Sequence, residues 1–226
     1  MSRSLPTPAR PWFVTFEGLD GSGKSTHLRL AAAWLASQEV PHRVSHEPGG
    51  TALGDAIRAL FLDPRWGALD GRVELLMVFA SRRQHLLELI EPALAAGCSV
   101  LCDRFTDSTR AYQGAGRGVP QRLIDHVDRL ATGGRRPDRT LLFDLPAAVA
   151  RGRGQSPRRT ARQAGEGGAD RLDVEGLEFY ARVRDGYLAL AAAERERFRV
   201  IDSSGPREQT AAQVRSALAD LWELAP

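Results

Sequence analysis

The sequence contains very little lysine. Of its 31 lysine and arginine residues only Lys24 is a lysine, and the net charge is +3 at pH 7. A general preference for arginine explains the bias, so the one exception marks a position that requires a compact ammonium group rather than a planar guanidinium. The weak positive charge by itself fits anionic small substrates and nucleic acid equally well.

Other absences narrow the possible functions further. The 226 residues include no asparagine, so the Asn-Lys-x-Asp guanine site of a GTP-driven switch protein is excluded. No run of about 18 apolar residues is present, and we expect no membrane span. The two cysteines, Cys98 and Cys102, lie in one apolar run and are too few for a disulfide framework or a zinc site. These features predict a cytoplasmic protein.

The length suits one folded unit, because single hydrophobic cores grow to roughly 250–300 residues before chains divide. We expect residues 1–11 to form a loose N-terminal tail and residues 12–226 to form a single domain. Within that domain, residues 151–171 are dense in arginine, glycine and small polar residues. Such a segment cannot bury a core, so we expect it to be mobile.

Short apolar runs alternate with helical patterns along the chain. The expected strands are Trp12–Phe16, Arg43–Ser45, Cys98–Cys102, Thr140–Phe143 and Phe198–Ile201. The expected helices are Lys24–Ala36, Thr51–Leu62, Val73–Ala96, Pro120–Ala131, Leu177–Ala193 and Glu208–Leu224. This alternation predicts a three-layer α/β fold, with a parallel sheet and helices on both faces. Ligands of such sheets bind beyond the carboxyl ends of the strands.

A phosphate-binding motif joins the first strand to the first helix. Residues 18–25 read G-L-D-G-S-G-K-S and fit the pattern G-x-x-x-x-G-K-[ST]. Its glycines allow backbone amides to surround phosphate oxygens, Lys24 reaches the β- and γ-phosphates, and the Ser25 hydroxyl reaches Mg²⁺. The predicted ATP-binding residues are Gly18, Leu19, Asp20, Gly21, Ser22, Gly23, Lys24, Ser25 and Thr26.

An acidic and a basic residue follow the strand Cys98–Cys102. Asp103 is expected to bind Mg²⁺ or its waters together with Ser25, because a P-loop needs a carboxylate nearby. Arg104 would point into the same cleft and clamp a second phosphate. The alternative is an exposed ion pair at a strand end.

Two further sets of residues could contact nucleotides. Phe79 and either Arg82 or Arg83 share one face of a predicted helix, where a base could stack on the ring. On spacing alone, however, a Phe in the core beside an outward Arg is favoured. The segment 151–171 carries Arg151, Arg153, Arg158, Arg159, Arg162 and Arg171. These arginines could form a closing lid over the phosphates, or simply a solvated loop or a nucleic-acid-binding arm.

Several segments together resemble the thymidylate kinase family. They are F-E-G-L-D-G-S-G-K-S-T from Phe16, E-P-G-G-T from Glu47, F-A-S-R from Phe79, D-R-F-T-D-S-T-R-A-Y-Q-G-A-G-R-G from Asp103, R-P-D from Arg136 and D-R-L-D from Asp170. Their order and spacing match the family over residues 12–205. The block from Asp103 to Gly118 is far more specific than the P-loop, which many unrelated proteins share.

The resemblance implies a P-loop kinase fold and transfer of the γ-phosphoryl group of ATP to dTMP, giving dTDP and ADP for dTTP biosynthesis. It also implies Mg²⁺, a homodimer and no nucleic-acid or membrane partner. The nearest alternative is another nucleoside monophosphate kinase. The predicted catalytic residues are Asp20, Lys24, Arg104 and Arg153, the last chosen among lid arginines that the resemblance does not align one by one. The implied dTMP-binding residues are Glu47, Pro48, Phe79, Arg82, Arg104, Thr109, Tyr112 and Gln113.

Individual roles also follow from the resemblance. Asp20 would lie near the transferred phosphoryl group and the sugar 3′-hydroxyl, Phe79 would stack on thymine, and Tyr112 would lie under the deoxyribose and exclude a 2′-hydroxyl. Some family members carry an arginine inside the P-loop, whereas this chain has Gly21 and Ser22 there. It therefore resembles the bacterial type, in which the lid supplies the arginine.

Overall fold

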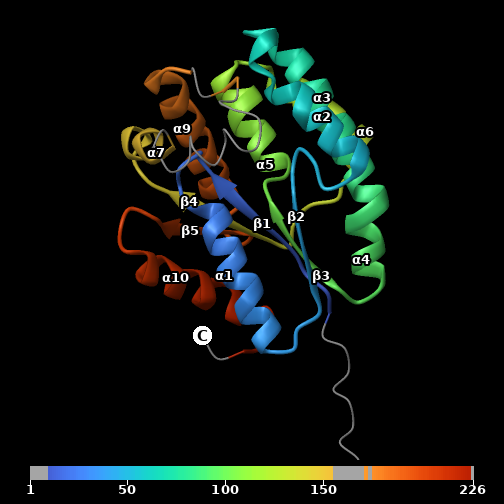
Figure 1. Cartoon of the computed structure of the whole chain (residues 1–226), viewed down its shortest axis with the longest axis vertical. Coiled ribbons are helices and arrows are strands. Elements are labelled where there is room, and N and C mark those ends of the chain that lie inside the picture. Colours follow the sequence, from blue (N-terminus) through green and yellow to red (C-terminus); the bar gives the residue numbers. More distant parts are fainter. Residues whose placement is uncertain (1–9, 155–170, 173–174, 225–226) are drawn as a thin grey trace, which may run out of the picture.

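The computed structural model describes residues 10–154, 171–172 and 175–224 (Figure 1). Its centre is a parallel sheet of five strands in the order β2-β3-β1-β4-β5. The strands are β1 (Phe13–Gly18), β2 (His42–His46), β3 (Ser99–Asp103), β4 (Arg139–Asp144) and β5 (Phe198–Asp202). All five expected strands are present, and the predicted α/β fold class is confirmed.

Helices connect the strands. They are α1 (Lys24–Ser37), α2 (Ala52–Leu62), η1 (Pro64–Trp66), α3 (Gly71–His85), η2 (Leu86–Ile90), α4 (Glu91–Ala95), α5 (Thr106–Thr109), η3 (Arg110–Gly116), α6 (Gln121–Thr132), α7 (Ala147–Gly154), α9 (Leu177–Ala193) and α10 (Arg207–Ala219). The expected long helix Val73–Ala96 consists of α3, the wider π-helical turn η2 and α4. The sequence did not predict η1, α5, η3 or α7.

Apolar residues of the strands bury the two faces of the sheet against different helices. Val14 and Phe16 of β1 pack in one cluster with residues of α1 and α10, including Leu35 and Leu218. On the opposite face, Phe13 packs with residues of η2 and α4. Burial on both faces explains why the inner strands β1, β3 and β4 read as largely continuous apolar runs rather than as alternating patterns.

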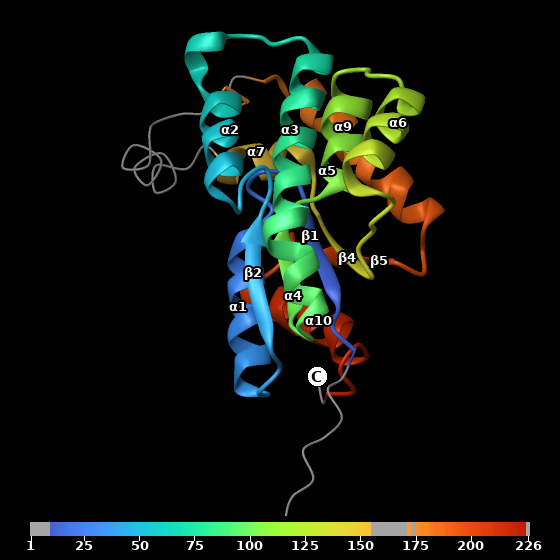
Figure 2. The ribbon, with the colours of Figure 1, turned by 90° about the vertical axis from the view of Figure 1, so that its right-hand side faces the viewer.

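The helices α2, α3 and α6 extend beyond the carboxyl ends of the strands (Figure 2). α3 packs against both α2 and α6, and α9 packs along η3. The sequence predicted a ligand site beyond the carboxyl ends of the strands. Helices therefore surround this region. Among the helices of the described residues, none is long and apolar enough to cross a membrane.

The two ends of the expected lid are structured. Its first residues, Arg151 to Gly154, form the last turn of α7. At the other end Arg171 is only 3% exposed, and it makes an ion pair with Glu74 at 2.7 Å and donates to the Phe61 carbonyl oxygen. The expectation that Arg171 belongs to a mobile lid is therefore wrong, because its guanidinium is anchored in the protein interior.

Other parts of the predicted organisation involve residues that the structure does not describe. Arg158, Arg159 and Arg162 lie outside the described residues, as do residues 1–9 of the expected tail. Arg10, at the end of that tail, makes an ion pair with Asp138 at 2.6 Å. The division into a tail and a single domain stays a prediction.

Candidate active site

The P-loop turns between the end of β1 and the start of α1. Gly23 precedes the helix with a φ of 87°, a left-handed conformation that glycine adopts without strain. Lys24 begins the helix and is only 6% exposed. The first turn of α1 therefore presents its amides and its positive dipole end to the loop, an arrangement suited to phosphate groups.

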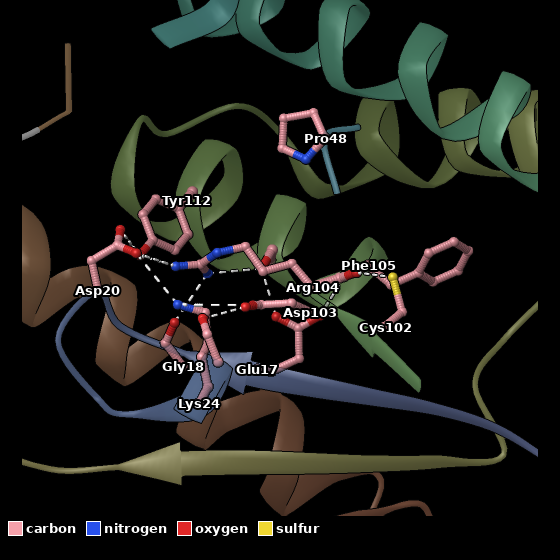
Figure 3. Close-up of polar contacts among 12 residues, drawn as sticks. Glu17, Gly18, Asp20, Lys24, Pro48, Cys102, Asp103, Arg104, Phe105 and Tyr112 are labelled. Atoms are coloured by element: carbon pink, nitrogen blue, oxygen red, sulfur yellow. Dashed lines mark hydrogen bonds and ion pairs between the residues drawn. The ribbon is translucent and has the colours of Figure 1, made fainter. Parts of the chain in front are cut away.

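Asp20, a residue of the P-loop, lies between two cations, Lys24 and Arg104. Its Oδ1 is 3.3 Å from Lys24 Nζ and accepts a hydrogen bond of 2.8 Å from the NH2 group of Arg104 (Figure 3). The Tyr112 hydroxyl donates to the second carboxylate oxygen at 3.2 Å. The fold thus brings three predicted site residues, from the end of β3, from η3 and from α1, around one carboxylate.

Ser25 and Asp103, the predicted metal ligands, are in contact. The Ser25 hydroxyl donates to Oδ2 of Asp103, while Oδ1 is buried, accepts no hydrogen bond within the described residues and lies 4.0 Å from Lys24 Nζ. No cluster of three or more His, Cys, Asp or Glu side chains suited to a metal occurs in the same part of the chain. One hydroxyl and one carboxylate suit Mg²⁺, which keeps several waters and takes phosphate oxygens as its other ligands.

Arg104 follows β3 with a φ of 75°, a conformation that non-glycine residues rarely adopt. Its guanidinium lies 4.9 Å from the centre of the Tyr112 ring. Burial opposes the charge of this guanidinium, but neighbouring Tyr112 and Asp20 raise the pKa of Arg104 well above its usual range. The residue is therefore a permanent cation held at the end of β3.

The second candidate region surrounds Arg82 on α3, which is 2% exposed. Its Nε donates to Glu47 Oε2 at 2.6 Å, its NH1 donates to the Thr109 hydroxyl at 3.1 Å, and its guanidinium lies 4.6 Å from the centre of the Phe79 ring. Arg83 is exposed and donates to the carbonyl of Ala131. The geometry therefore favours Arg82 over Arg83 as the candidate for reading a base.

The remaining predicted dTMP-binding residues lie close by. Glu47 is 2% exposed, and its second oxygen lies 2.9 Å from His85 Nδ1. Its carboxylate therefore contacts both Arg82 and His85. Pro48 follows it through a cis peptide bond. Gln113 is 3% exposed, and its amide group donates to Glu74 at 2.9 Å.

Comparison with known proteins decides the family. The family model described as thymidylate kinase matches residues 16–214. The chain is 49% identical to a thymidylate kinase of Desulfovibrio desulfuricans (91% of this chain, 94% of the relative) and 44% identical to one of Pseudomonas savastanoi pv. phaseolicola (94% and 97%). The chain belongs to the thymidylate kinase family. A solved thymidylate kinase from Ehrlichia chaffeensis has the same fold, with a TM-score of 0.70, 33% identity and coverage of 92% of this chain and 98% of that one.

These matches confirm the predicted family, the P-loop kinase fold and the class of enzyme, a nucleotide kinase. They also show that this kinase shares nearly its whole length with its relatives, since the matched regions cover 94% and 97% of the two relatives named. The roles of individual residues are not tested by similarity alone and rest on the geometry described above.

Two buried carboxylates of this kinase were missed at the sequence level. Glu17, at the end of β1, is fully buried, and burial together with the charge of Asp107 raises its pKa to about 7. Glu74 is also fully buried, and it pairs with both Arg171 and Arg117. A charged residue at the end of an otherwise apolar strand was the available signal for Glu17, because such charges are buried only with partners.

Arg153, the predicted catalytic arginine of the lid, lies at the end of α7. Its guanidinium donates to the carbonyl oxygens of Ser203 and Ser204, at 2.7 and 3.0 Å. The helix that carries it contacts the P-loop directly, since a Cβ atom added to Gly21 would lie 2.1 Å from the Ala150 carbonyl oxygen. The backbone of the helix turn that carries Arg153 is therefore next to the P-loop. The Arg153 side chain, however, extends to the loop after β5.

Proposed function

We propose that this thymidylate kinase transfers the γ-phosphoryl group of ATP to dTMP, giving ADP and dTDP. One observation carries the proposal: Lys24 and Arg104 contact the same oxygen of Asp20, at 3.3 and 2.8 Å. A cation of the P-loop and a cation suited to a second phosphate are thereby held one carboxylate apart. Two phosphate groups bound at these cations would be adjacent, as phosphoryl transfer between nucleotides requires.

On the donor side, the P-loop amides of residues 18–26 and the Lys24 ammonium would hold the phosphates of ATP. Ser25 and Asp103 would hold Mg²⁺, which, when bound, neutralises charge that develops on the phosphate oxygens. Lys24 contributes a compact charge that can follow the transferring group, and the low exposure of its side chain strengthens that charge by excluding water.

On the acceptor side, Arg104 would bind the phosphate of dTMP. An oxygen of this phosphate attacks the γ-phosphorus while the bond to the β-γ bridging oxygen breaks, and the leaving ADP takes the electron pair. The attacking phosphate is already largely ionised at neutral pH, since its second pKa is about 6, so no protein base is required. Asp20 then aligns the two cations rather than removing a proton.

The base would lie beside Arg82. The guanidinium occupies one face of the Phe79 ring and is fixed by Glu47 and Thr109, so thymine would meet an oriented donor and an aromatic edge or face. Gln113 and Tyr112 belong to the wall formed by η3, and Pro48 borders the same region. Because Glu47 accepts the hydrogen bond from Arg82 Nε, we assign Glu47 as the residue that positions Arg82.

Because the P-loop lacks arginine, the lid would supply the charge that stabilises the transition state. Arg151 and Arg153 enter the lid from α7, and Arg153 stays our candidate among them. Binding of the nucleotides would have to draw its side chain away from the carbonyl oxygens of Ser203 and Ser204.

We further propose a cytoplasmic homodimer. Leu53 and Leu60 of α2 and Leu76 of α3 are 53%, 50% and 61% exposed, and α2 and α3 pack side by side. Such a leucine-rich surface would be covered in a dimer. Light scattering of the wild type and of the Leu76→Glu variant tests this, and a wild-type monomer would contradict it.

The proposed reaction is tested by supplying the purified protein with ATP, Mg²⁺ and one nucleoside monophosphate at a time and measuring ADP. We expect rapid release with dTMP, slower release with dUMP and almost none with AMP, GMP or CMP. Faster turnover with AMP or CMP than with dTMP would favour the alternative, another nucleoside monophosphate kinase. The Lys24→Ala variant provides the blank.

A further inference from the structure

Two of the hydroxyl groups that hold Arg104 lead to one buried carboxylate. The NH1 group of Arg104 donates to the hydroxyls of Ser108 and Tyr187, at 3.0 and 3.1 Å, and to the Gly18 carbonyl oxygen at 3.0 Å. Both hydroxyls in turn donate to Oε2 of Glu17, at 2.5 and 2.9 Å. Because each hydroxyl has one proton, donating it to Glu17 leaves its lone pairs available to accept from Arg104.

The same carboxylate also fixes the backbone at Arg104. Oε1 of Glu17 accepts a hydrogen bond of 2.7 Å from the amide of Phe105, the residue directly after Arg104. Arg104 has its left-handed φ of 75° at this point, and a hydrogen bond to a charged acceptor is stronger than one to a neutral acceptor. The Glu17 side chain therefore contacts both the backbone turn after Arg104 and the hydroxyl groups that accept from the NH1 group of Arg104.

The arrangement leaves the other edge of Arg104 directed at Asp20 of the P-loop. Its NH2 group contacts Asp20 and the Tyr112 hydroxyl, at 2.8 and 3.2 Å, and Glu17 lies behind the guanidinium on the side of the sheet (Figure 3). Glu17 itself is fully buried and cannot touch a substrate. Its hydrogen bonds connect it to the proposed site through the partners of Arg104 and through the residue after it.

We propose that Glu17 is a positioning residue, which orients Arg104 for the acceptor phosphate through the hydroxyls of Ser108 and Tyr187 and through the amide of Phe105. The proposal rests on the assignment of Arg104 to the phosphate of dTMP. It requires the carboxylate to be an acceptor only, since a donor at this position would take up the hydroxyl lone pairs that Arg104 uses.

The ionisation of Glu17 is set by its neighbours on every element around it. Asp107 of α5, Tyr187 of α9, Cys102 of β3 and Arg104 itself face the carboxylate. Burial and the Asp107 charge raise the pKa of Glu17 to about 7, against the opposing effect of Arg104. Protonation therefore occurs within the range in which the kinase can be assayed, and it supplies an independent test.

The experiment compares the wild type with Glu17→Gln, which keeps the shape but turns one acceptor into a donor. We expect the KM for dTMP to rise at least about tenfold, the value of one hydrogen bond to a charged group, and the KM for ATP to stay within about twofold. Thr15→Val removes a buried hydroxyl from the same strand without contacting Arg104, and it should leave both KM values unchanged.

The pH profile provides a second readout. In the wild type, kcat/KM for dTMP should fall as the pH decreases through about 7, where Glu17 gains a proton. Glu17→Gln should lose this step but keep the step near pH 6 that belongs to the phosphate of dTMP. A variant with an unchanged KM and the wild-type profile would overturn the proposal.

A failure of the proposal can be separated from a failure of the assignment of Arg104. If Arg104→Ala leaves the KM for dTMP unchanged, the assignment itself is wrong; if Arg104→Ala raises it and Glu17→Gln does not, only the role of Glu17 is wrong. In the Arg104→Ala background Glu17→Gln should have no further effect. Should Glu17→Gln fail to fold, Tyr187→Phe replaces it, with a rise of several-fold expected and no rise contradicting the proposal.

Discussion

Replacing Glu17 by Gln should alter how the stability of the protein depends on pH. In the unfolded chain this carboxyl has an ordinary pKa near 4.5, whereas burial, followed by the charge of Asp107, raises the pKa to about 7 in the folded protein. Between these two values the folded protein keeps a proton that the unfolded chain has released. Stability must therefore fall as the pH rises through this window and level off above it.

The size of the effect follows from the same pKa values. A shift from 4.5 to about 7, at about 1.4 kcal/mol per pKa unit, corresponds to about 3 kcal/mol. This is the cost of keeping Glu17 ionised at alkaline pH, and it is a large share of a total stability that is typically about 5–15 kcal/mol. Gln carries no such cost, because it does not titrate.

The assay is urea unfolding of the wild type and of Glu17→Gln between pH 5 and 8.5. Subtracting the two stability curves removes the contributions of other titrating groups, such as His46 and Asp128. The variant should gain stability relative to the wild type by about 3 kcal/mol across this range. Parallel curves would refute the reasoning, since they would mean that the folded protein holds Glu17 with an ordinary pKa.

Further predictions concern the cations and the sugar. Lys24→Ala should lower kcat by roughly 100-fold or more and Lys24→Arg should also be severely impaired, because the ammonium is buried between carboxylates; full activity of the arginine variant, measured by ADP release, would contradict this. Glu47→Gln should raise the KM for dTMP roughly tenfold by removing the counter-ion of Arg82, whereas Arg83→Ala should leave it unchanged. Tyr112→Ala should raise kcat/KM for ribothymidine monophosphate relative to dTMP, and an unchanged ratio would remove Tyr112 as the gate against a 2′-hydroxyl.

The sequence predicted those parts of the site that are local in the chain. The P-loop follows from eight consecutive residues between a strand and a helix, so the contact between Lys24 and Asp20, four residues apart, was accessible. The inner strands β1, β3 and β4 were also accessible, because burial on both faces leaves an apolar run in the sequence. The edges of these strands shifted by only a few residues in the structure.

Contacts between distant parts of the chain could not be predicted in the same way. Glu17 and the amide of Phe105 are 88 residues apart, and Arg171 and Glu74 are 97 apart. Composition placed Arg171 in a solvated segment because its neighbours are arginine, glycine and small polar residues. The buried carboxylate of Glu74 on α3 outweighed that local tendency. Nothing near Arg171 in the sequence indicates this contact.

The last turn of α7 packs so closely against the P-loop that residue 21 has no room for a side chain. A Cβ at Gly21 would lie 2.1 Å from the Ala150 carbonyl oxygen and 2.8 Å from the Gly154 amide nitrogen, and the φ of 84° also disfavours any side chain. An arginine at this position would therefore displace the last turn of α7. That turn carries Arg151 and Arg153. The space next to the P-loop is therefore filled by a helix that carries arginines, and glycine at residue 21 supports our proposal that the transition-state arginine comes from the lid.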